Sequence, residues 1–120
     1  MPGVQQINYK GHVIYFMDFS NIAKATEIRD IMHESAQYIH SQPPASVLSL
    51  SNVTGMRFTQ EIKELFNTFI EGNKPYIKAS AVFGLNGLQL IFNGLLRVTN
   101  RHINSFSSEI EAKDWLVSNV

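Results

Sequence analysis

The spacing of hydrophobic residues changes several times along this 120-residue chain, and these changes constrain its fold more than any single motif. Runs rich in β-branched and aromatic residues predict strands, whereas apolar residues three and four positions apart predict helices. The strand pattern occurs five times, at residues 4–9, 12–18, 46–51, 79–83 and 103–106. The helical pattern occurs four times, starting near Lys24, Thr59, Gly87 and Ser108.

The predicted element order is therefore ββαβαβαβα, an α/β domain with a mixed five-stranded sheet and four helices. The Lys10-Gly11 step favours an antiparallel hairpin between the first two strands. Strands separated by helices are expected to pair in parallel through right-handed crossovers. The chain has the size of one ordinary domain, so we assign residues 1–120 to a single core.

Composition argues against several functional classes. Ten basic and ten acidic residues cancel, and no basic stripe is present, which disfavours nucleic acid as a partner. Without cysteine, disulfides, thiolate metal sites and cysteine nucleophiles are excluded. No apolar stretch approaches the roughly 18 residues of a membrane span. The first residues lack the layout of a secretory signal, so a cytoplasmic location is expected.

Four segments carry a resemblance to a known family: VIYFMDFS at 13–20, VLSLSNVTGMRFTQEI at 47–62, NKPYIKASAVFGLNGLQ at 73–89 and INSFSSEIEAKDWL at 103–116. With the element order, they make the chain resemble the STAS/SpoIIAA-like family, and within it small bacterial proteins related to both STAS and CRAL-TRIO domains. The segments are packing and turn patterns, so the resemblance bears on fold more than on function.

Classical STAS domains are protein-interaction modules, including anti-sigma-factor antagonists, and some bind nucleotides or small ligands. Regulated members carry a phosphorylated serine before the second helix, in an Asp-Ser-Ser-Gly setting. Here Phe58 aligns with that serine, Arg57 replaces the aspartate, and the glycine is absent. We therefore do not expect the classical phospho-switch, and we expect Thr59 to cap the helix.

The loop Ser51–Thr59 is the expected contact surface for a partner, because it leads from a strand end into a helix. Its candidate binding residues are Ser51, Asn52, Thr54, Arg57, Phe58 and Thr59. A second candidate is the turn Gly84-Leu85-Asn86-Gly87, where Gly84, Asn86 and Gly87 join a strand to a helix and free N–H groups could hold an anion. Glycine torsions needed by the turn are the simpler explanation.

Residues for catalysis or metal binding do not form a recognisable set. His33 and His40 are seven positions apart, too far for two ligands of one zinc ion on a helix, so no metal or other cofactor is expected. No Gly-x-Ser-x-Gly elbow occurs. Asp18 ends a predicted strand, where a carboxylate more often accepts loop hydrogen bonds than catalyses a reaction.

The predicted third helix has a broad apolar stripe, formed by Leu88, Ile91, Phe92, Leu95, Leu96 and Val98. Such a stripe fits deep burial, a homodimer interface, or one wall of a pocket for an apolar ligand. In the last case Phe92 and Leu96 would face the ligand together with Phe66 and Phe69.

Two functions follow as hypotheses. The first is a non-enzymatic regulatory module that binds a protein partner or a second copy of itself. The alternative is a carrier of a small apolar or lipid-like ligand, on the CRAL-TRIO side of the resemblance. An enzyme ranks third, with its chemistry expected near Asp18, Ser51, Asn52 and Asn86.

Overall fold

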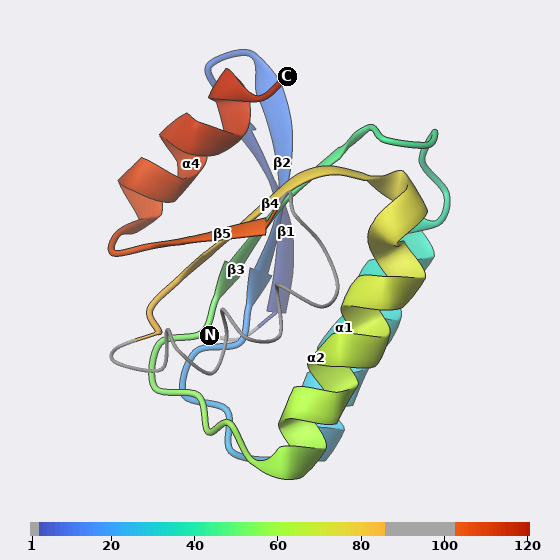
Figure 1. Cartoon of the computed structure of the whole chain (residues 1–120), viewed down its shortest axis with the longest axis vertical. Coiled ribbons are helices and arrows are strands. Elements are labelled where there is room, and N and C mark those ends of the chain that lie inside the picture. The colour runs from blue at the N-terminus through green and yellow to red at the C-terminus, as the bar shows by residue number, and fades with distance from the viewer. Residues whose placement is uncertain (1–2, 86–102) are drawn as a thin grey trace.

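A computed structural model of the chain describes residues 3–85 and 103–120 and shows a five-stranded mixed sheet (Figure 1). The strands are β1 Gly3–Tyr9, β2 His12–Asp18, β3 Val47–Asn52, β4 Ile77–Phe83 and β5 Ile103–Phe106. They lie in the order β1-β2-β3-β4-β5. β1 and β2 are antiparallel and the other pairs are parallel, which confirms the predicted hairpin and the mixed sheet.

The described helices lie on both faces of this sheet. They are α1 Ala25–Ile39, α2 Gln60–Asn73 and α4 Glu109–Ser118, and a short 3-10 turn at Lys74–Tyr76 follows α2. α1 and α2 run side by side on one face, and α4 covers the other (Figure 1). The predicted helix at 87–100 lies outside the described residues. Among the described helices, none has the length and apolar character needed to cross a membrane.

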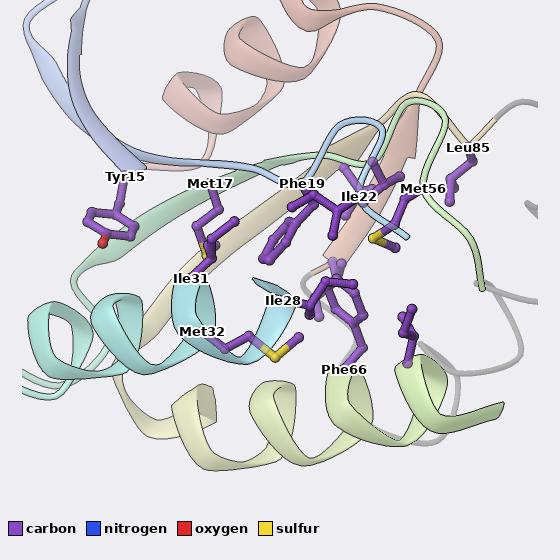
Figure 2. Packing of buried hydrophobic residues seen from close by; sticks show 14 of the residues in the cluster. Tyr15, Met17, Phe19, Ile22, Ile28, Ile31, Met32, Met56, Phe66 and Leu85 are labelled. Carbon is purple, nitrogen blue, oxygen red and sulfur yellow. The ribbon is translucent and has the colours of Figure 1, made fainter. Parts of the chain in front are cut away.

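The alternation of side chains along each strand divides the hydrophobic core into two layers. Under α1 and α2, Met17, Phe19, Ile28 and Phe66 belong to one buried cluster (Figure 2). Under α4, Leu48 and Leu50 of β3 pack with Ala112 and Leu116. β3 is buried on both faces because helices cover it on both sides.

Local sequence signals placed several element ends correctly. The Thr59 hydroxyl accepts a hydrogen bond from the Ile62 N–H at 3.2 Å, so Thr59 caps α2 as expected. The Ser108 hydroxyl likewise accepts from the Glu111 N–H at 3.2 Å at the start of α4. In the hairpin, Gly11 has φ of +83° and Lys10 also has a positive φ, of +49°.

Candidate functional site

The carboxyl ends of β2, β3 and β4 meet at one edge of the sheet. Asp18 is paired with Asn52, and Asn52 with Phe83, so the loops that leave these strands start side by side. We call residues 19–24, 53–59 and 84–85 the carboxyl-edge loops. Most of the candidate contact residues therefore lie within one small area.

Hydrogen bonds between backbones tie the carboxyl-edge loops to each other. The Asn21 N–H donates to the Thr54 carbonyl at 2.8 Å, and the Val53 N–H donates to the Phe83 carbonyl at 3.0 Å. Within the central loop, the Asn52 side-chain oxygen accepts from the Thr54 N–H at 3.0 Å and from its hydroxyl at 2.7 Å. The first two loops are thus tied to each other, and the second is tied to the end of β4.

Gly84 lies close to Thr54 of the central loop. Its φ is +90°, a conformation that residues with side chains rarely adopt. A Cβ atom at this position would lie 2.7 Å from the Thr54 nitrogen and 2.9 Å from the Thr54 Cα. The prediction that this turn requires glycine torsions is therefore confirmed at Gly84. Asn86 and Gly87 lie outside the described residues.

The candidate residues of the central loop differ in their exposure. Thr54, Arg57 and Thr59 are exposed and can contact a partner. Phe58 is half-buried, with its ring centroid 6.0 Å from that of Phe66, so it anchors the loop to the core. Ser51 is buried and belongs to a different environment, under α2.

Asp18, the carboxylate that seemed the best candidate for catalysis, has a local structural role. Its Oδ1 accepts a hydrogen bond from the Ser20 N–H at 2.9 Å, which orders the turn after β2. No cluster of histidine and acidic residues suited to a metal ion occurs within residues 3–85 and 103–120. His40 is exposed, and its ring hydrogen-bonds the buried Asn73 side chain at 2.9 Å and stacks on Tyr76.

Under α2 the sheet carries small polar residues where larger apolar ones would fill the space. Ser49, Ser51 and Ser80 are buried there, and the Ser49 and Ser80 hydroxyls share a hydrogen bond of 2.5 Å. Around them lies a cavity of about 40 Å³, which we call the serine pocket. Its apolar walls include Phe66 and Phe69. The Ser51 hydroxyl borders it without a hydrogen bond to a described residue.

The sequence argument missed Ser49, Ser80 and Asn73 as pocket residues. The signal was present in the alternation of serine and leucine along β3, which places serines on one face of a buried strand. Of the four proposed apolar walls, Phe66 and Phe69 do line the pocket. Phe92 and Leu96 lie outside the described residues, so their part in a pocket or in a dimer interface stays a prediction.

The fold and the site define a small α/β domain with a connected loop surface at one sheet edge and a narrow polar-floored pocket under one helix. Comparison with protein-family models, with curated proteins and with solved structures finds no match. Membership of the STAS/SpoIIAA-like family therefore stays a prediction.

Proposed function

We propose that this chain is a non-enzymatic, regulatory protein-interaction module that contacts its partner through the carboxyl-edge loops. The observation that carries the proposal is the hydrogen-bonded backbone of these loops, which displays Thr54 and Arg57 to solvent. Loops held in place before binding lose little conformational entropy when a partner docks. The resemblance to STAS domains, which are interaction modules, points the same way.

Arg57 is the expected anchor of this surface. Its side chain is exposed, while its N–H is directed to the Ile22 carbonyl at 3.5 Å, so the backbone beneath it is supported. Arginine is enriched among the residues that dominate binding energy at protein interfaces. The surface next to it includes the hydroxyl of Thr54 and offers hydrogen bonds rather than a reactive group.

Regulation through phosphorylation of this loop is not part of the proposal. Phe58 occupies the aligned position of the classical serine and packs against Phe66. The Thr59 hydroxyl is engaged as the cap of α2, and modifying it would remove that hydrogen bond. We therefore propose that partner binding at this loop does not depend on its phosphorylation.

Site-specific photocrosslinking in the native host tests the proposal. A photoreactive residue at position 57 should yield a discrete crosslinked protein, which excess unmodified chain competes away. The same residue at Ser118, exposed at the end of α4, is the matched control and should not yield that product. A photoreactive residue at position 54 gives a second chance of capture. The proposal would be contradicted by identical products from positions 57 and 118, or by no product from either position 57 or position 54.

The serine pocket favours a second candidate, a carrier of a small ligand that is mainly apolar. Its lining is apolar apart from the serines and Asn73. The cavity of about 40 Å³ has room for about three waters, so a larger ligand requires α2 to move outward. Native mass spectrometry should then detect a bound mass in the wild-type protein. The Ser51→Val variant, which fills the cavity, should lose that mass, and a wild-type protein free of ligand would refute the candidate.

A further inference from the structure

The two edges of the sheet differ in how they are protected. β5, at one edge, has four residues, and short edge strands are poor templates for pairing. β1, at the other edge, has seven residues and pairs with β2 along its whole length without a register shift. Its sequence GVQQINY contains no charged residue and no proline. Within its own residues, β1 therefore lacks the charges and the proline that commonly keep an edge from accepting another strand.

A groove runs beside this open edge on the face that carries α1. Val4, Gln6, Tyr15, Glu34 and Tyr38 line a hollow of about 230 Å³, which we call the β1 groove. Two stacked rings, those of Tyr15 and Tyr38, form its aromatic floor, with centroids 4.4 Å apart. The hollow is continued by a second one of about 260 Å³ that shares Gln6 and both tyrosines.

The flank of α1 above the β1 groove is acidic. Glu27, Asp30 and Glu34 are spaced three and four positions apart, so they lie along one side of the helix, and all are exposed. Of the basic residues on or beside α1, Arg29 is on another side, where it pairs with Glu61 of α2 at 3.0 Å, and Lys24 is the N-cap residue before the helix. The described residues that line the two hollows include no lysine or arginine.

This charge pattern selects the kind of strand that the edge accepts. A second copy of the chain, paired β1 to β1 around a two-fold axis, would bring two acidic α1 flanks to the same face of the joined sheet. Like charges at such a contact are unfavourable. A segment with basic side chains on that face is complementary, because side chains on a strand point to each face at every second residue.

We propose that β1 binds an extended segment of a partner protein as a sixth strand, with lysine or arginine at alternate positions facing the β1 groove. Backbone hydrogen bonds to Gly3–Tyr9 supply the pairing, and the β1 groove with Glu34 supplies the selectivity. The tyrosine rings can add a favourable contact to a cationic side chain. This inference rests on the proposed function for the existence of a partner, and it names a second, independent surface.

A designed peptide tests the inference without knowledge of the partner. The probe is a heptapeptide of alternating lysine and threonine, and the matched peptide carries glutamate at the lysine positions. With the lysine peptide, amides of β1 should become protected from hydrogen exchange, and fluorescence anisotropy should report saturable binding. The glutamate peptide should leave exchange in β1 unchanged.

Two single variants separate the charge of the groove from general electrostatics. Glu34→Gln should weaken binding of the lysine peptide about two- to fivefold, the range expected for loss of one exposed ion pair. Glu71→Gln removes the same charge from an exposed position on α2 and should leave binding unchanged. The inference is overturned if β1 amides stay unprotected, if both peptides bind equally, or if the two variants behave alike.

The outcome is distinguishable from that of the photocrosslinking experiment. A partner captured at position 57, with no peptide bound at β1, would keep the proposed function and reject the sixth strand. Sedimentation of the chain alone as a dimer with protected β1 amides would also reject it, because a second copy would then occupy the edge.

Discussion

Replacing Gly84 by alanine tests whether the carboxyl-edge loops form a tightly packed frame. Two costs arise at this position. Alanine at φ of +90° is in a conformation that costs about 1–2 kcal/mol for a residue with a side chain. The added methyl group would also stand 2.7 Å from the Thr54 nitrogen, and relief of such overpacking by backbone shifts typically costs about 1–3 kcal/mol. We expect Gly84→Ala to reduce the free energy of unfolding by about 3 kcal/mol.

Urea unfolding followed by the fluorescence of Trp115, the single tryptophan, measures this loss. With a urea dependence of about 1–3 kcal/mol per molar, the midpoint should fall by roughly 1–3 M. Gly11→Ala is the matched control, because Gly11 has φ of +83° but no atom within 4 Å of the added Cβ. It should cost only the conformational part, about 1 kcal/mol.

The contact with Thr54 gives a further check. Thr54→Ala removes the hydroxyl but leaves the backbone nitrogen and Cα in place, so it should not rescue Gly84→Ala. Equal losses for Gly84→Ala and Gly11→Ala would refute the claim that the loops are packed against each other. Full rescue by Thr54→Ala would show that only the side chain is in the way.

Three further predictions concern stability. Ser80→Ala leaves the Ser49 hydroxyl without its partner and should reduce the free energy of unfolding by about 1–3 kcal/mol. In a double-mutant cycle measured by urea unfolding, the variant with both Ser49→Ala and Ser80→Ala should lose less stability than the two single variants added together. Strict additivity of the two losses would contradict this. Thr59→Ala removes the cap of α2 and should cost about 1 kcal/mol, whereas Thr59→Ser should retain most of it in thermal melts. Hydrogen bonds from Lys10 and Tyr9 lower the pKa of Asp114, so its contribution to stability is present above the ordinary carboxyl pKa and is lost as the pH falls through the lowered value. Asp114→Asn should flatten the acid side of a plot of melting temperature against pH, and an unchanged slope would count against it.

The strands were predictable where the hydrophobic pattern is local and unambiguous. β2 and β5 have the predicted bounds. β4 begins at Ile77, two residues before its predicted start at Ala79. The sequence could not reveal this because Lys78 interrupts the apolar run, while pairing of Ile77 with Val47 extends the strand.

The candidate site was predictable in position but not in orientation. Parallel strands end at a common edge, so the grouping of Asn52, Thr54 and Gly84 followed from the predicted topology. The inward direction of Ser51 did not follow, because β3 is covered on both faces and alternation alone cannot say which layer receives the serines. The packing of Phe58 on Phe66 depends on where α2 crosses the sheet, which no local pattern encodes.

The crossover helices also explain why the described loops after β2 and β3 offer a surface and not a cleft. In open α/β sheets, ligand crevices form where neighbouring crossovers leave toward opposite faces and the loops separate. Here α1 and α2 lie on the same face, as Figure 1 shows, so the loops after β2 and β3 leave in the same direction. They close on each other through the bond from the Asn21 N–H to the Thr54 carbonyl at 2.8 Å. A closed, polar loop surface is suited to contact with a macromolecule more than to enclosure of a substrate, and this geometry, independent of any resemblance, supports the proposed interaction module.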